Sequence, residues 1–350
     1  MRLEPALSGG SSPDKTTIFD VAQRAGVSIK TVSRVVNNEP NVRERTREKV
    51  MKAVAELQYR PNSAARGLSG KRSYVLGLIY ENASEFSYMK HVLDGALDAC
   101  DGTGYTLLLC PLKLPNPNAL DRIRTFATQA RVDGALLPAP IGDLEGVVEL
   151  MRELEIPIAT ITPKQPADDA INVSCDDART SQALTEFLIE QGHRRIGFIK
   201  GHPDHRASEE RYVGYKKALK KHSIKLDSSL VHQGYFTFDS GRAATSKLLS
   251  LKDRPTAVMA SNDDMAAGAA FTIREFGLTV PDDVSIVGYD DTPVAAHIWP
   301  PLTTARQPIE AMAEHAGQLL IRRLRGEEVE SPESAFHCEV VIRQSTRAVS

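Results

Sequence analysis

A glycine between two short amphipathic segments is the feature that most constrains the fold of this chain. Residues 18–25 and 29–37 each place small apolar side chains on one face, and Gly26 separates them. Glycine readily adopts the left-handed conformation that ends a helix. Ser28 is a favoured cap for the helix that follows. The stretch therefore predicts a helix-turn-helix.

The second segment predicts a DNA-reading surface. Val32 and Val36 are expected to face inward, which puts Lys30 and Arg34 on the opposite face of the helix. Long basic donors suit the O6 and N7 atoms of guanine in a major groove. The alternative, ordinary solvated charges, is disfavoured by the small-residue, glycine and valine spacing around them. Polar side chains nearby are expected to contact phosphates: Ser28, Thr31, Ser33 and Asn37.

A third helix completes the predicted head. Residues 43–57 carry apolar side chains at helical spacing, which we interpret as core rather than as functional groups. They are Val50, Ala53, Val54 and Leu57. At the start of the head, Thr17 and Asp20 have the spacing of a capping box for the first helix.

Residues 60–68, RPNSAARGL, predict a marginal hinge helix. Pro61 suits its first turn, but about two turns are too short for an isolated helix. Gly67 weakens it by about 1 kcal/mol relative to alanine. Two copies in a dimer can fold in a minor groove and wedge Leu68 into the central step. A disordered linker accounts for these residues equally well.

Charge is distributed unevenly along the chain. Residues 17–72 hold 12 Lys/Arg and five Asp/Glu, while the whole chain has a net charge of −2. Because residues 1–16 are neutral, residues 73–350 carry −9. A basic head on an acidic body indicates a polyanionic partner for the head, the alternative being a merely solvated basic surface.

The cysteines and the N-terminal segment indicate the compartment. The four cysteines form no CxxC pair and are interpreted as buried thiols in a reducing compartment: Cys100, Cys110, Cys175 and Cys338. Residues 1–16 lack the apolar core of a signal peptide and are predicted to be a flexible tail. No apolar run is long enough to span a bilayer. We therefore expect a cytoplasmic, nucleoid-associated protein with no membrane partner.

The remainder of the chain alternates apolar strands with helix-length segments. Near-continuous apolar runs separated by helices predict parallel sheets covered on both faces, a doubly wound α/β body in two lobes. The runs are residues 74–79, 105–109, 134–137, 157–161, 195–199, 257–260 and 284–287. A further strand is predicted over residues 338–342, and no leucine heptads follow it.

Polar residues follow several of these strands. Arg211 lies just inside the helix after residues 195–199, Asn262 follows residues 257–260, and Asp290 follows residues 284–287. Ligand sites in such folds lie at the carboxyl ends of strands. A converging Arg, Asn and Asp set can satisfy sugar hydroxyls or a base edge. Helix capping is the alternative for the Asn and Asp residues. Aromatic side chains after the first strand are expected to form an apolar wall: Phe86 and Tyr88.

Taken in order, the motifs resemble the lactose/galactose repressor family over nearly the whole chain. They are DVAQRAGVSIKTVSRVVNN, TREKV, PNSAARGL, GHRRIGFIKG, ERYVGYKKAL, SNDDMAAGA, VSIVGYDDTP and PLTTARQP. The resemblance implies an all-α helix-turn-helix domain with a hinge helix, followed by a two-lobed, periplasmic-binding-protein-like α/β effector domain. The implied boundaries are a tail at 1–16, a head at 17–59, a hinge at 60–72 and an effector domain at 73–350. The implied lobes are about 73–174 with 306–336, and about 175–305 with 337–350.

The resemblance also implies roles for single residues. The base-reading positions are Ile29, Lys30 and Arg34, and Thr17 and Tyr59 join the expected phosphate contacts. The hinge positions in the minor groove are Asn62, Ala65 and Leu68. The expected effector contacts are Phe86, Tyr88, Thr162, Arg211, Asn262, Asp290 and Gln307.

The chain departs from the family pattern at two positions. Arg43 stands where many relatives have a capping serine, and Thr162 stands where sugar-binding relatives often have an acidic or other polar contact. Thr162 therefore leaves the choice of ligand open. The resemblance places Trp299, the single tryptophan, near a dimer interface.

The sequence predicts a regulator rather than an enzyme. It has no GxSxG, HExxH or Walker motif, and no cofactor is expected. His202 and His205 lie in a loop without a third ligand, so no metal site is expected. The prediction is a homodimeric repressor that binds a pseudopalindromic double-stranded operator and is released by a small-molecule effector, a sugar or sugar derivative. One alternative makes a ligand or protein the corepressor; a solute-binding protein or sugar enzyme leaves the head unexplained.

Overall fold

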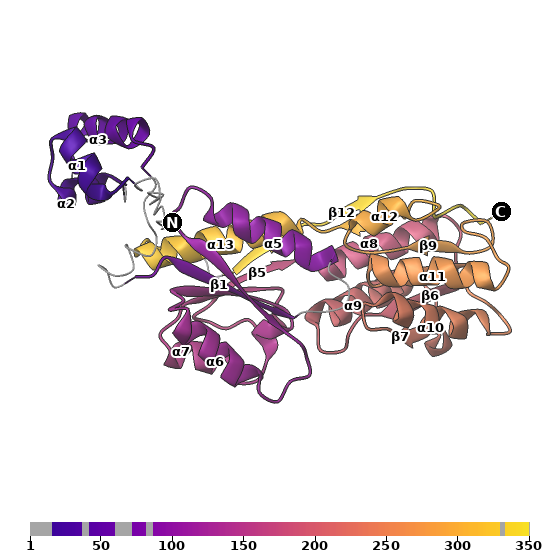
Figure 1. The fold of residues 1–350 in the computed structure, drawn as a ribbon. Helices are drawn as coiled ribbons and strands as arrows, with labels where there is room; N and C mark the ends of the chain where they lie inside the picture. Colours follow the sequence, from indigo (N-terminus) through magenta and orange to yellow (C-terminus); the bar gives the residue numbers. More distant parts are fainter. Residues whose placement is uncertain (1–15, 37–41, 60–71, 82–86, 330–332, 350) are drawn as a thin grey trace, which may run out of the picture. The chain divides into compact units, whose positions relative to one another are not determined.

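The computed structural model describes residues 16–36, 42–59, 72–81, 87–329 and 333–349. The chain divides into two units, Met1–Ser73 and Tyr74–Ser350. The first unit contains three described helices and the second contains all the described strands (Figure 1). Most of the predicted tail and hinge, residues 1–15 and 60–71, lies outside the described residues.

The first unit is built from α1 (Ile18–Ala25), α2 (Ile29–Val36) and α3 (Glu44–Glu56). Its core consists of small side chains that allow the helices to approach closely: Val21, Ala22, Val32, Val35, Val50 and Ala53. The inner face of α2 includes one residue more than predicted. Val35 is 3% exposed, and the predicted Val36 is half-buried and packs against the same core. Val32 and both of these valines therefore face α1 and α3.

The predicted caps of the first unit are present, with one change. Asp20 accepts hydrogen bonds from both the backbone N–H and the hydroxyl of Thr17, each at 2.7 Å, so Thr17 donates its hydroxyl to the carboxylate. Gly26 ends α1 at φ 64°. The Ser28 hydroxyl accepts from the Thr31 N–H at 3.2 Å and so caps α2. Arg43 begins α3 without a side-chain cap.

The second unit contains two parallel sheets, as predicted for a doubly wound body, and a small antiparallel sheet that was not predicted. The first sheet has the order β11-β5-β4-β3-β1-β2 and the second the order β7-β6-β8-β9. The strands of the first sheet are β1 (Val75–Glu81), β2 (Thr106–Leu112), β3 (Gly134–Pro138), β4 (Ile158–Ile161), β5 (Ile171–Cys175) and β11 (Glu333–Phe336). Those of the second are β6 (Ile196–Lys200), β7 (Val231–Gln233), β8 (Ala257–Ala260) and β9 (Ser285–Val287). The antiparallel pair is β10 (Thr304–Arg306) and β12 (Glu339–Val341).

Helices cover both faces of each parallel sheet (Figure 1). On the first sheet, α5 (Ser87–Cys100) and α13 (Ile309–Arg325) pack on one face and α6 (Ala119–Gln129) and α7 (Val147–Glu153) on the other. On the second, α8 (Asp177–Glu190) and α9 (Arg206–Lys221) pack on one face and α10 (Phe238–Leu249) and α11 (Asp263–Glu275) on the other. The short elements are α12 (Pro293–His297), η1 (Ile141–Asp143) and η2 (Ser228–Leu230).

The apolar runs of the sequence correctly predicted seven of the parallel strands and missed β5, β7 and β11. The sequence of β5, INVSC, contains two polar residues, Asn172 and Ser174, that are nevertheless buried. Asn172 is accommodated because its amide donates to the Ala167 carbonyl at 2.9 Å and its Oδ1 accepts from the Thr160 hydroxyl at 2.9 Å. The predicted strand at 338–342 is β12, which pairs with β10 outside both large sheets.

The chain passes between the two lobes of the second unit at three places. These are the step from β5 to α8, the step from β10 to α13, and the step from β11 to β12. Within the described residues, no helix is both long and apolar enough to cross a membrane.

Candidate functional site

The exposed face of α2 carries the three predicted base-reading side chains. Lys30 and Arg34 are exposed on the side of the helix away from Val32 and Val35, and Ile29, 40% exposed, lies at the edge of that face. Basic side chains can donate to acceptors on base edges, and an exposed apolar side chain beside them can contact a thymine methyl group. This face has the composition that DNA reading requires.

Five of the predicted phosphate contacts lie among the described residues of the first unit. Thr17 and Ser28 are exposed, and the Ser28 and Thr31 hydroxyls hydrogen-bond to each other at 2.9 Å. Ser33 is half-buried, as is Tyr59, which packs against the core of the first unit. The remaining predicted DNA contacts lie outside the described residues: Asn37, Asn62, Ala65 and Leu68.

A cavity of about 500 Å³ lies at the carboxyl ends of both parallel sheets. From the first lobe it is lined by Glu81, Tyr88, Met89, Lys113, Leu114, Ala139 and Thr162. From the second lobe and its crossover it is lined by His202, His205, Ala207, Arg211, Tyr235, Phe236, Thr237, Asn262, Asp264, Asp290 and Gln307. Six of the seven predicted effector contacts therefore share one cavity. The seventh, Phe86, lies outside the described residues.

A buried guanidinium organises the wall of the cavity. Arg211, on α9, is 3% exposed, and its Nε donates to Asp177 Oδ1 at 2.7 Å. It also pairs with Asp290 Oδ1 at 3.4 Å and donates to the Ser261 carbonyl. Its guanidinium carbon lies 3.7 Å from the centre of the Tyr289 ring, a cation–π contact. Asp177 was not among the predicted site residues.

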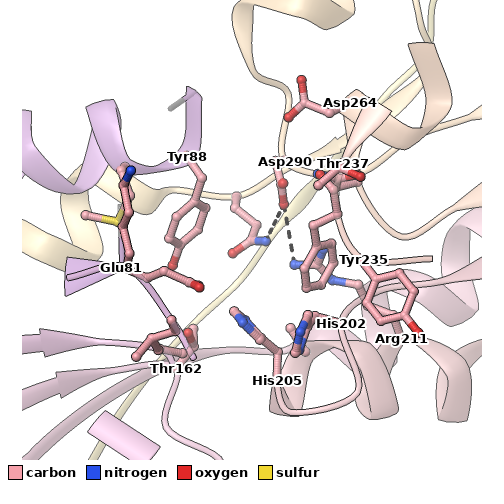
Figure 2. Close-up of a pocket in the computed structure, with 18 residues that line it drawn as sticks. Glu81, Tyr88, Thr162, His202, His205, Arg211, Tyr235, Thr237, Asp264 and Asp290 are labelled. Carbon is pink, nitrogen blue, oxygen red and sulfur yellow. Dashed lines mark hydrogen bonds and ion pairs between the residues drawn. The ribbon is translucent and has the colours of Figure 1, made fainter. Parts of the chain in front are cut away.

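Asp290 is the least satisfied member of this group. Burial raises the pKa of its carboxyl to about 7, against the opposing attraction of Arg211. Gln307 donates to Asp290 Oδ1 at 2.7 Å, one of the interactions drawn in Figure 2. The backbone of Asp290 has φ 106°, which is strained for a residue with a side chain. A buried, strained carboxyl with a perturbed pKa is typical of a binding site.

Asn262 both caps a helix and lines the cavity, the two alternatives that the sequence left open for it. Its Oδ1 caps α11 by accepting from the Met265 N–H at 3.0 Å, and its Nδ2 donates to the Phe236 carbonyl at 2.9 Å. The same side chain lines the cavity. One hydrogen of the amide and one lone pair of the oxygen remain for a ligand.

The first lobe contributes a phenol and a hydroxyl that contact each other. Tyr88 hydrogen-bonds to the Thr162 side chain, and burial raises the pKa of the Tyr88 phenol, so it remains a neutral donor. Thr162 has φ 53° and donates its hydroxyl to the Ile161 carbonyl at 2.8 Å. Figure 2 shows both side chains on the side of the cavity opposite Arg211.

Two histidines and a glutamate line the cavity without having been predicted as effector contacts. Burial, with the nearby His202 and Arg211, lowers the pKa of His205 to about 4, so its ring is neutral. The His202 and His205 rings meet edge to face at 5.4 Å. Burial raises the pKa of Glu81, and His202 opposes that shift. His202 and His205 follow β6, and Glu81 ends β1. The strand-end rule that located Asp290 therefore applies to them as well.

Asp263, Asp291 and Trp299 do not line the cavity. Asp263 is fully buried and accepts from the Thr292 N–H at 2.8 Å and the Thr304 hydroxyl at 2.6 Å, so it fixes the loop rather than lining the cavity. Asp291 pairs with Arg306 and Arg343. Trp299 is 84% exposed.

Comparison with known proteins identifies the family. Residues 17–62 match the bacterial regulatory proteins, lacI family, and residues 185–346 match the periplasmic binding protein-like domain. The repressor PurR of Vibrio vulnificus is 34% identical over 339 residues, covering 95% of this chain and 99% of that protein. The chain belongs to the lacI family of bacterial regulatory proteins. The regulator DegA of Bacillus subtilis is also 34% identical, over 334 residues that cover 95% of this chain and 98% of DegA.

Solved structures of family members extend the likeness to the whole fold. A complex of the regulator CelR with cellobiose has a TM-score of 0.73 at 32% identity and covers 94% of this chain and 99% of that one. The lac repressor dimer bound to operator and the anti-inducer ONPF has a TM-score of 0.75 at 28% identity, covering 96% and 100%. As a lacI-family protein, this chain is a DNA-binding transcriptional regulator and not an enzyme.

Proposed function

We propose that this regulator is a repressor that binds a pseudopalindromic operator as a homodimer and releases it when a sugar or sugar derivative enters the cavity. The observation that carries the proposal is the set of polar groups at the carboxyl ends of both sheets, centred on Arg211, Asp290 and Gln307. Guanidinium, carboxylate and amide groups together supply the donors and acceptors that vicinal hydroxyls require.

In this proposal the exposed face of α2 reads each half-site. Lys30 and Arg34 donate to guanine edges, and Ile29 contacts a thymine methyl. Phosphate contacts from Thr17, Ser28, Thr31, Ser33, Asn37 and Tyr59 fix the register. Residues 60–72 act as the hinge between the head at 17–59 and the effector domain at 73–350. There Asn62, Ala65 and Leu68 contact the minor groove between the half-sites.

The effector contacts proposed are Tyr88 and Thr162 from the first lobe, Arg211, Asn262 and Asp290 from the second, and Gln307 from the crossing between β10 and α13, with Phe86 as an apolar wall. A ligand that bridges both sides favours one relative arrangement of the lobes and so shifts the population of operator-binding states. The CelR complex with cellobiose supports a carbohydrate as the ligand class. We place the protein in the cytoplasm, where operator DNA and metabolites meet.

The test is selection of genomic fragments by the purified full-length protein, followed by sequencing. An enriched palindrome with a central pyrimidine–purine step is the expected result, and its neighbouring genes nominate the effector. Titration of the protein–duplex complex with candidate sugars then shows the direction of the effector's action. A sugar that releases the duplex is an inducer, and one that tightens duplex binding is a corepressor. Enrichment that is equal for all sequences would contradict base reading by α2.

A further inference from the structure

Two cysteines lie on two of the segments that join the lobes. Cys175 is the last residue of β5, immediately before the chain passes to α8. Cys338 lies between β11 and β12, where the chain passes between the lobes again. Phe336 of β11 pairs with Cys175 across the sheet, so the two crossing segments run side by side. Regulation by DNA and effector, as proposed above, makes no use of either thiol.

The two thiols lie on these neighbouring segments and differ in chemistry. Interaction with the other thiol lowers the pKa of Cys338 and raises that of Cys175. The Tyr289 hydroxyl also donates to Cys338 Sγ at 3.6 Å. Cys175 is buried, whereas Cys338 is half-buried, which corrects the expectation that all four thiols are buried. The more exposed thiol is thus also the better nucleophile.

The same pair contacts the residues that organise the cavity. Cys175 Sγ donates to Asp177 Oδ2 at 3.3 Å and lies 3.4 Å from Gln307 Oε1. Asp177 holds Arg211, and Gln307 holds Asp290. One atom therefore contacts the partners of both charged groups in the cavity wall.

We propose that Cys175 and Cys338 form a reversible disulfide when the protein meets a hydroperoxide. The Cys338 sulfur attacks the hydroperoxide, breaking its O–O bond; an alcohol leaves and Cys338 becomes a sulfenic acid. The Cys175 sulfur then attacks the Cys338 sulfur, forming the S–S bond and releasing water with the thiol proton. Two thiols lose two electrons in total, and the hydroperoxide is reduced to alcohol and water.

The disulfide acts on the cavity by removing a donor. Oxidised Cys175 has no S–H to donate, so Asp177 loses its thiol donor, and two crossing segments become covalently joined. Loss of one net hydrogen bond corresponds to a change of roughly two- to tenfold in a local opening equilibrium. The consequence for effector response rests on the proposed function, whereas disulfide formation does not.

The test uses the reduced full-length protein, hydrogen peroxide as the oxidant and dithiothreitol as the reductant. After alkylation, peptide mass mapping should show Cys175 joined to Cys338, with the number of free thiols falling from four to two and returning on reduction. The double variant Cys100→Ala/Cys110→Ala is the matched control, because it retains only the proposed pair and should form the same cross-link. Cys338→Ser and Cys175→Ser should each abolish it.

Hydrogen exchange then tests the link to the cavity. Amide exchange at Asp290 and Gln307 should rise roughly two- to tenfold on oxidation. Over-oxidation of Cys338 without a cross-link, or a cross-link between other cysteines, overturns the disulfide. A Cys175–Cys338 bond with unchanged exchange overturns the effect on the cavity. Neither readout uses DNA or effector, so failure here is distinct from failure of the proposed function.

Discussion

Replacing Asp290 with asparagine should stabilise the fold and remove effector binding. Asparagine has the shape of the carboxyl but no charge, and its Oδ1 can still accept the bond from Gln307 that Asp290 accepts at 2.7 Å. Arg211 keeps Asp177 as its partner at 2.7 Å. A residue that only supports an ion pair would behave in the opposite way, since its loss would leave a charge buried without a partner.

The size of the expected gain in stability follows from the pKa of Asp290. Burial raises it from 3.8 to about 7. As the pH rises, the unfolded chain loses this proton first, so stability falls between about pH 4 and pH 7, and the penalty is complete above pH 7. A difference of three units corresponds to about 4 kcal/mol, the upper limit of what Asp290→Asn can recover at pH 8.

Urea unfolding of the wild-type and Asp290→Asn proteins at pH 5 and pH 8 measures this difference. The variant should gain between about 1 and 4 kcal/mol at pH 8 and much less at pH 5. Calorimetry with the inducing sugar should show loss of binding in the same variant. A variant that is less stable than wild type at pH 8 would refute the reasoning, because Asp290 would then be a structural partner of Arg211.

Three further predictions concern the head and the cavity wall. Arg34→Ala should weaken operator binding by about 1–3 kcal/mol with little effect on random DNA in a fluorescence anisotropy titration, and the exposed Arg45→Ala serves as the matched control. Equal losses on both duplexes would contradict base reading. Ser28→Ala removes the cap of α2 and should lower the free energy of unfolding of the head by about 0.5–2 kcal/mol, followed by circular dichroism. Gly201→Ala would place its Cβ 2.1 Å from the Phe236 ring, so effector affinity should fall in calorimetry while operator affinity is kept.

Local rules predicted the parts of the structure that depend on neighbours in sequence. Gly26 ends α1 and Ser28 caps α2, because both interactions close within a single turn of chain. The strand-end rule brought Arg211, Asn262 and Asp290 into one cavity for a similar reason: parallel strands of a sheet finish at the same edge.

Long-range pairings were not predictable in this way. Asp177 precedes Arg211 by 34 positions, and nothing in its sequence context shows that it is the guanidinium's strongest partner. His202 and His205 were considered only as metal ligands, although they stand at a strand end just as Asp290 does. The deeper burial of Val35 than of Val36 depends on how three helices meet, which periodicity alone does not fix.

The arrangement of charge explains why a ligand in this cavity can act on the lobes. Two carboxylates share one guanidinium, and Asp177 at 2.7 Å is the stronger partner of Arg211 while Asp290 at 3.4 Å is the weaker. A ligand hydroxyl that donates to Asp290 stabilises its ionised form and lowers its raised pKa, so binding is strongest where the free cavity is least satisfied. Asp290 is held by Gln307, which lies on the crossing from β10 to α13. In the proposed function, ligand binding therefore acts on a segment that joins the lobes, where a small displacement would change their relative arrangement.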